Sequence, residues 1–118
     1  MKIEDLLMYQ TDVLVVPAGD TVFSEGEPGD SMYVVVSGTA EISVRGKLVE
    51  TAKTGTIFGE MALIDNSPRS ATVVAVEDCS LIAINATRFS ALTREAPDFA
   101  LHVMRAMADR LRNAGRQL

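Results

Sequence analysis

The chain has 118 residues, of which 47% are hydrophobic and 23% are charged, and its formal net charge is −5 at pH 7. This length fits one folded domain over residues 1–118 and leaves no room for a second module of similar size. The ordinary composition argues against disorder, and the net negative charge argues against direct nucleic acid binding, which depends on Lys and Arg.

Short β-like runs separated by turn residues occupy most of the chain, after an amphipathic start at Ile3, Leu6 and Leu7. The eight predicted strands are residues 13–16, 21–23, 32–36, 40–44, 48–52, 56–58, 71–76 and 81–84. Strands this short, with turns this frequent, predict a mainly β fold with helices. We expect an eight-stranded antiparallel β-roll, or jelly roll, over about residues 12–84, preceded by a short N-terminal helix.

Helical spacing replaces the strand pattern after residue 84. Asn85 or Thr87 can cap a helix over about residues 86–95. Pro97 is tolerated at the first position of a helix, and it predicts a second helix over about residues 97–114. The fold is therefore expected to end in two helices.

An apolar stripe runs along the last predicted helix. Its members are spaced 4, 3, 4, 3 and 4 residues apart and are Ala100, Met104, Met107, Leu111, Ala114 and Leu118. This is the spacing of a heptad seam. Two interpretations stay open, because the stripe can pack on the β-roll or can join the helices of two copies of the chain.

The run of residues 58–75, FGEMALIDNSPRSATVVA, has features that suit a small phosphate. Gly59 lets a ligand approach the backbone closely, and the helical turn that follows offers unpaired N–H groups. Arg69 adds a planar cation that can bind two phosphate oxygens. A structural interpretation is also open, in which Arg69 and Glu60 form a surface ion pair worth under about 1 kcal/mol.

Two segments resemble the cyclic-nucleotide-binding domain family, which includes catabolite-activator-type regulators, cyclic-nucleotide-gated channels and cyclic-nucleotide-dependent kinases. Gly59-Glu60-Met61-Ala62-Leu63, followed by Pro68-Arg69-Ser70-Ala71-Thr72, is similar to the phosphate-binding cassette of that family. Residues 26–38, GEPGDSMYVVVSG, resemble the strand, turn and strand that precede the cassette. The resemblance covers about residues 10–115.

The resemblance implies a ligand-binding site for cyclic AMP or cyclic GMP. It implies that Arg69 and the N–H groups around Ser70 and Ala71 bind the phosphate, and that Glu60 accepts a hydrogen bond from the ribose 2′-OH. The complete predicted set is Phe58, Gly59, Glu60, Met61, Ala62, Arg69, Ser70, Ala71 and Thr72. No catalytic residue, metal or cofactor is expected, and cyclic AMP is preferred over cyclic GMP.

The base is left unassigned by these residues. In the family a hydroxyl residue after the arginine can help to recognise guanine, yet serine also occurs in cAMP-binding bacterial members, so Ser70 does not decide. The family usually covers the base from a C-terminal helix. Here the residues available for an aliphatic lid are Val103, Met104, Met107 and Leu111.

Three classes of function are considered. The first is a non-catalytic sensor that moves its last two helices and acts on a dimer partner or a separate effector protein. The second is a structural dimerisation or interaction module with the same fold. The third, an enzyme, is disfavoured because the single histidine, His102, cannot supply the histidine cluster of cupin-like metal oxygenases.

The sequence also bears on the cellular location. No apolar run approaches the roughly 18 residues that span a bilayer, and the acids Glu4 and Asp5 stand where a secretory signal is apolar. Cys79 is the single cysteine, so an internal disulfide is excluded. We expect a cytoplasmic protein without a membrane span, in which Cys79 is a structural thiol.

Overall fold

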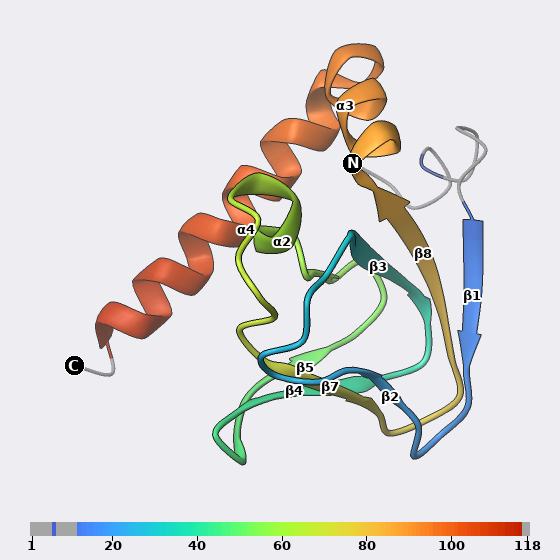
Figure 1. Cartoon of the computed structure of the whole chain (residues 1–118), viewed down its shortest axis with the longest axis vertical. Coiled ribbons are helices and arrows are strands. Elements are labelled where there is room, and N and C mark those ends of the chain that lie inside the picture. Colours follow the sequence, from blue (N-terminus) through green and yellow to red (C-terminus); the bar gives the residue numbers. More distant parts are fainter. Residues whose placement is uncertain (1–5, 7–11, 117–118) are drawn as a thin grey trace.

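The computed structural model describes residue 6 and residues 12–116. In chain order the elements are β1 (Asp12–Val16), β2 (Thr21–Phe23), β3 (Ser31–Ser37), β4 (Ala40–Val44), β5 (Lys47–Ala52), β6 (Ile57–Phe58), α2 (Met61–Ile64), β7 (Thr72–Ala75), β8 (Cys79–Asn85), α3 (Ala86–Glu95) and α4 (Pro97–Arg116). Figure 1 shows the strands gathered into one roll, with the long helix α4 running along its side.

Two four-stranded sheets build the roll, with strand orders β1-β8-β3-β6 and β2-β7-β4-β5. All of their strand pairs are antiparallel. The predicted eight-stranded antiparallel β-roll is thus confirmed, and each predicted strand end lies within two residues of the observed one. The predicted N-terminal helix falls mainly on residues 1–5 and 7–11, which lie outside the described residues.

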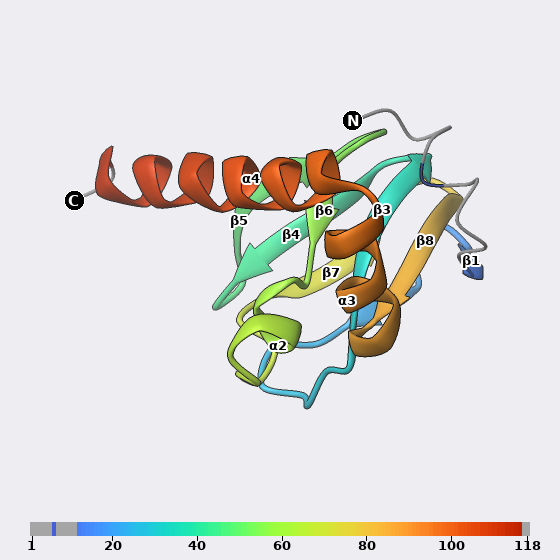
Figure 2. The same ribbon diagram turned by 90° about the horizontal axis from the view of Figure 1, so that it is seen from above.

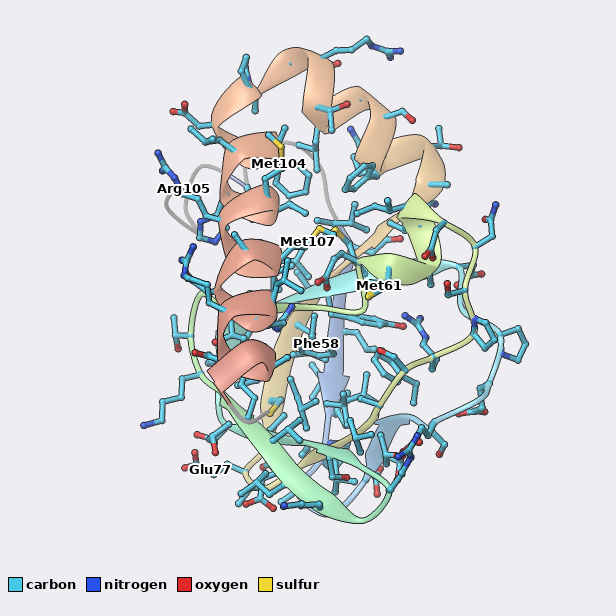
Figure 3. All side chains as sticks on the ribbon, turned by 90° about the vertical axis from the view of Figure 1, so that its left-hand side faces the viewer. Phe58, Met61, Glu77, Met104, Arg105 and Met107 are labelled. Carbon is cyan, nitrogen blue, oxygen red and sulfur yellow. The ribbon has the colours of Figure 1, made fainter. Side chains whose placement is uncertain are left out.

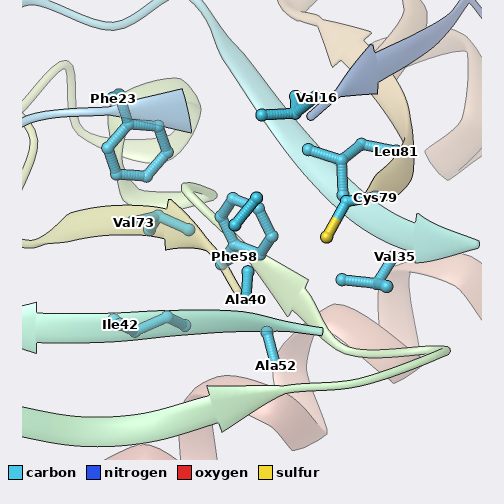
Figure 4. Close-up of a cluster of buried hydrophobic side chains, with 11 residues drawn as sticks. Val16, Phe23, Val35, Ala40, Ile42, Ala52, Phe58, Val73, Cys79 and Leu81 are labelled. Atoms are coloured by element: carbon cyan, nitrogen blue, oxygen red, sulfur yellow. The ribbon is translucent and has the colours of Figure 1, made fainter. Parts of the chain in front are cut away.

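Strands β3 and β8 are buried on both faces, because each alternates its side chains between two cores. On β3, Val35 faces the other sheet while Met32 and Val34 face the helices, and on β8 the same division separates Leu81 from Ile82. Figure 4 shows the first core, between the sheets, where Phe23 and Phe58 pack together. The second core joins the outer face of the first sheet to α3 and α4.

Helix α3 begins after Asn85, whose side-chain oxygen accepts a hydrogen bond of 2.9 Å from the Arg88 backbone N–H. Such a cap satisfies one of the unpaired donors of the first turn. Helix α4 then docks through Phe99 and Val103, which are 0% and 2% exposed. Figure 2 shows α4 lying across the end of the roll beside α3.

The apolar stripe of α4 does not pack as a unit. Met107 joins the core under the helices, whereas Met104 is 57% and Leu111 is 75% exposed. In Figure 3, Met107 faces the roll and Arg105 projects away from it. The stripe is therefore divided between packing on the roll and an exposed apolar face. Its last member, Leu118, lies outside the described residues.

In the part of the chain that the structure describes, no helix combines the length and the apolar character required to cross a bilayer.

Candidate ligand-binding site

A cavity of about 280 Å³ opens between the sheet β2-β7-β4-β5, the segment around α2 and the last turns of α4. Its lining residues are Phe23, Ile42, Val44, Val49, Glu50, Phe58, Gly59, Glu60, Met61, Ala62, Pro68, Arg69, Ser70, Ala71, Val73, Arg110, Asn113 and Ala114. Figure 3 shows Phe58 at the end of its strand and Met61 on the short helix beside it. The residues come from segments far apart in the sequence, so the cavity exists only in the folded chain.

Eight of the nine predicted site residues line this cavity, and Thr72 does not. The hydroxyl of Thr72 instead accepts a hydrogen bond of 3.0 Å from the backbone N–H of Glu25. That bond joins the start of β7 to the turn after β2. A contact between Thr72 and a ligand stays a prediction.

Gly59 has a backbone conformation that other residues rarely adopt, with φ of +81°. A Cβ at this position would lie 2.7 Å from Nη1 of Arg69 and 3.3 Å from the ring of Phe23. In the absence of a Cβ, Nη1 of Arg69 donates a hydrogen bond of 3.2 Å to the Gly59 carbonyl oxygen. Glycine is needed here both for the turn and for the approach of the guanidinium.

Arg69 is a buried cation, 6% exposed, and no carboxylate pairs with it among residues 6 and 12–116. Its guanidinium carbon lies 4.0 Å from the ring centroid of Phe23, a cation–π arrangement. Its Nε is buried without a hydrogen-bond partner. A buried cation with an unused donor is costly, so this arrangement favours an anion as its missing partner.

The segment that resembles the family ahead of the cassette holds Arg69 in place. The Arg69 backbone N–H donates to the Glu27 carbonyl oxygen, and the Arg69 carbonyl oxygen accepts from the Gly26 N–H, both at 2.8 Å. A Cβ on Gly29 would collide with the guanidinium. The turn at residues 26–29 therefore fixes the backbone of Arg69 and leaves space for its side chain.

Glu60 is 4% exposed and pairs with an arginine of α4 rather than with Arg69. Nη1 of Arg110 donates to Oε1 of Glu60 at 2.9 Å. The same guanidinium donates to both oxygens of Glu50, at 3.0 and 3.3 Å, and to the carbonyl oxygen of Ile57. The open interpretation of an Arg69–Glu60 surface pair is thus wrong, because both side chains are buried and have other partners.

The pKa of Arg110 reflects two opposing effects. Burial lowers it, but the hydrogen bond to Glu50 and the charges of Glu60 and Glu50 outweigh burial and raise it. The guanidinium is therefore held fully charged between the two carboxylates. It neutralises part of the negative charge that Glu50 and Glu60 bring to the cavity.

Sequence reasoning missed Glu50 and Arg110 as site residues. Glu50 lies on the same face of β5 as the buried Ala52, and Arg110 lies one heptad, or about two helical turns, after the buried Val103 on the same face of α4. These periodicities would have placed both side chains inward. The contact between them joins residues 60 positions apart, which local patterns do not reveal.

The proposed aliphatic lid is not in place over the cavity. The contributions of α4 to the lining are Arg110, Asn113 and Ala114, and none of the four candidate lid residues is among them. Three apolar strand residues, Ile42, Val44 and Val49, form part of the cavity wall. Val103 and Met107 face the core under the helices, and Met104 and Leu111 are exposed.

Cys79 and His102 lie outside the cavity lining. Cys79 is 1% exposed, and burial, followed by the charge of Glu77, raises the pKa of its thiol. His102 is half-buried on α4. Among the described residues, no group of three or more His, Cys, Asp or Glu side chains is arranged to hold a metal ion.

A family model described as the cyclic nucleotide-binding domain matches residues 13–96 of the chain. The cyclic AMP receptor protein of Thermus thermophilus is 35% identical over 120 residues, which cover 97% of this chain and 55% of the relative. The crystal structure of the Thermus thermophilus catabolite activator protein matches with a TM-score of 0.85 and 32% identity, over 98% of this chain and 56% of that one.

The cGMP-bound form of the EAL enzyme Bd1971 matches with a TM-score of 0.68 and 31% identity, over 90% of this chain and 30% of that one. The chain spans less than two thirds of the length of the curated relatives it matches first. The similarity therefore concerns one domain of larger proteins.

Proposed function

The chain belongs to the cyclic nucleotide-binding domain family, and on that premise we propose that it is a non-catalytic sensor of a cyclic nucleotide. The observation that carries this proposal is the buried guanidinium of Arg69, which has no carboxylate partner among the described residues and an unused Nε. A phosphodiester supplies the single negative charge and the oxygen acceptors that this cation lacks.

The phosphate and the ribose bind to different parts of the cavity. Arg69 and Gly59, with the N–H groups of Ser70 and Ala71, bind the cyclic phosphate, and Glu60 accepts a hydrogen bond from the ribose 2′-OH. Phe58, Met61 and Ala62 form the wall beside them. Because Arg110 partly neutralises Glu60, a negative residue can serve an anionic ligand at this end.

The base is proposed to be adenine. The wall formed by Ile42, Val44 and Val49 is apolar, and adenine is the less polar of the two purines. The name of the Thermus relative supports cyclic AMP, whereas the cGMP-bound neighbour keeps cyclic GMP as the second ligand to test. Ser70 lines the cavity and is available to either base.

The response is proposed to pass through α4, because that helix contributes Arg110, Asn113 and Ala114 to the cavity. A ligand that contacts α4 in one position of the helix and not in another shifts the population toward the first position. The recipient is a second copy of the chain or a separate effector, in the cytoplasm.

Isothermal titration calorimetry with cyclic AMP and cyclic GMP tests the proposal. We expect saturable binding of both, with cyclic AMP the tighter ligand, and a rise in the unfolding temperature that grows with ligand concentration. No binding of either nucleotide at millimolar concentration would refute it.

A second candidate function is a dimerisation or interaction module that does not signal through nucleotide. The exposed side chains of Leu101, Met104 and Leu111, which are 40%, 57% and 75% exposed, favour an interaction along α4. Sedimentation velocity at several protein concentrations, with and without cyclic AMP, separates the candidates. Dimerisation that nucleotide leaves unchanged would favour this module over the sensor.

A further inference from the structure

Three aromatic side chains form a cluster beside the guanidinium of Arg69. Phe23 on β2, Tyr33 on β3 and Phe58 on β6 contact one another, with ring centroids 5.5 to 6.0 Å apart. Tyr33 and Phe58 are partners across β3 and β6, and their rings stack at 28°. Phe23 meets them from the other sheet, as Figure 4 shows for Phe23 and Phe58. The rings thus hold one another in place.

The guanidinium of Arg69 lies against this cluster. Its carbon is 4.0 Å from the ring centroid of Phe23 and 5.8 Å from that of Tyr33. Phe23 is 9% and Arg69 is 6% exposed, and a ring attracts a cation more strongly where water is excluded. The backbone of Gly29 is also close, since a Cβ there would lie 2.3 Å from Nε of Arg69. The cation is therefore confined beside the ring of Phe23.

The chemical nature of this contact suits a site that must bind an anion. A carboxylate beside Arg69 would neutralise its charge and accept hydrogen bonds from the N–H groups that a phosphate requires. A ring attracts the cation without accepting those bonds. Nη1 of Arg69 bonds to the Gly59 carbonyl oxygen, and Nε has no partner. Phe23 therefore stabilises the cation and leaves its charge and its Nε donor available.

This attraction matters most before a ligand arrives. A buried cation without a counter-ion gains free energy by returning to water, and ordering a long arginine side chain costs entropy. If the ring attracted it less, Arg69 would turn toward solvent in a larger fraction of the molecules. The apparent dissociation constant is the intrinsic one divided by the fraction of molecules that is competent to bind. The ring thus affects affinity by keeping that fraction high.

We propose that Phe23 is a positioning residue, whose ring holds the guanidinium of Arg69 in place for the phosphate in the ligand-free protein. This inference deepens the proposed function and rests on it. In the sequence Phe23 looks like an ordinary apolar strand residue. Because Phe23 acts through Arg69, its effect on affinity depends on the presence of arginine at position 69.

Ring-fluorinated phenylalanine at position 23 tests the electrostatic part of the inference. Fluorine atoms withdraw electron density from the ring face but change the shape of the side chain little. We expect the affinity for cyclic AMP, measured by calorimetry, to fall from phenylalanine to the singly and then to the triply fluorinated ring, by about 3- to 30-fold in total. An unchanged affinity overturns the inference. A higher affinity also overturns it, because the ring would then compete with the phosphate.

Phe23→Leu, which removes the ring, tests whether Phe23 acts through Arg69. Cyclic AMP affinity is expected to fall about 3- to 30-fold in the wild-type background. In Arg69→Met, measured at higher ligand concentrations, the same substitution is expected to change it by less than about twofold. Equal losses in both backgrounds would mean that Phe23 only shapes the cavity, and would overturn the inference.

Phe89→Leu is the matched control. It removes one ring from the pair with Phe99, whose centroids are 5.8 Å apart in the core under the helices. It is expected to leave the affinity for cyclic AMP unchanged, and thermal unfolding of every variant checks the fold. If Phe23→Leu does not fold, the fluorinated proteins decide the outcome. A wild type that binds cyclic AMP but is insensitive to fluorination overturns this inference alone, whereas one that binds neither nucleotide also overturns the proposed function.

Discussion

Replacing Arg69 with methionine is expected to weaken ligand binding without lowering the stability of the ligand-free protein. The guanidinium is 6% exposed, its Nε has no partner, and no described carboxylate offsets its charge. Methionine removes the charge but keeps an unbranched, flexible side chain that can pack beside Phe23.

The expected changes follow from the contacts of Arg69. The loss of a charge-assisted hydrogen bond to the phosphate costs about 1.5 to 3 kcal/mol, which corresponds to about 10- to 150-fold in the dissociation constant. For the empty protein, burial of an uncompensated cation costs several kcal/mol. Its cation–π contact and its bond to Gly59 offset about 1 to 3.5 kcal/mol of that cost.

The unfolding free energy of Arg69→Met is therefore expected to equal or exceed that of the wild type by up to about 2 kcal/mol, a rise of up to about 8 °C in the unfolding temperature. Calorimetric titration and thermal unfolding measure the two quantities. Arg112→Met is the control at a 62% exposed side chain and should leave binding unchanged. A fall in unfolding temperature above about 4 °C, or an affinity within threefold of the wild type, would refute the reasoning.

Three further substitutions or measurements probe other features. Gly59→Ala should lower the unfolding free energy measured in urea by at least about 1 kcal/mol more than Gly46→Ala does. Both glycines have positive φ, but only at Gly59 would the added Cβ collide with Arg69. Equal losses in the two variants would show that this collision has no energetic cost. Cys79 should resist thiol reagents until the protein unfolds, because it is 1% exposed. The pKa of its thiol is raised in the folded protein, so its contribution to the unfolding free energy is present below the ordinary thiol pKa and declines as the pH rises through the raised folded value. Leu111→Glu, at a 75% exposed position, should leave stability unchanged within about 0.5 kcal/mol and dissociate any dimer seen by sedimentation; a wild type that stays monomeric at every concentration rules out the homodimer route.

Much of the fold could be predicted because local signals agree with it. Short apolar runs end at Gly, Pro and Asp turns, so the strands were found within two residues. The cassette was equally visible, since residues 58–62 and 68–71 line the cavity in one short stretch of sequence. Where turn residues and apolar alternation point to the same structure, tertiary packing does not need to override them.

The rest depended on contacts between distant segments. The partner of Glu60 was missed because Arg110 lies 50 residues away and looks, in sequence, like one more basic residue of a helix C-terminus. The heptad stripe did not reveal its packing for a related reason. It described an apolar spacing correctly, but Phe99 and Val103 determine which face of α4 docks, and Met104 and Leu111 fall outside that face.

The two main-chain hydrogen bonds that join residue 69 to Gly26 and Glu27 have a consequence for evolution and for protein engineering. They hold the backbone of this position without using its side chain, so the loop does not depend on arginine. A neutral residue at position 69 can therefore keep the same loop and give a cavity for an uncharged ligand. The main-chain contacts that shape the pocket are thus separate from the side chain that selects a charged or an uncharged ligand. A descendant can change ligands by altering that single side chain.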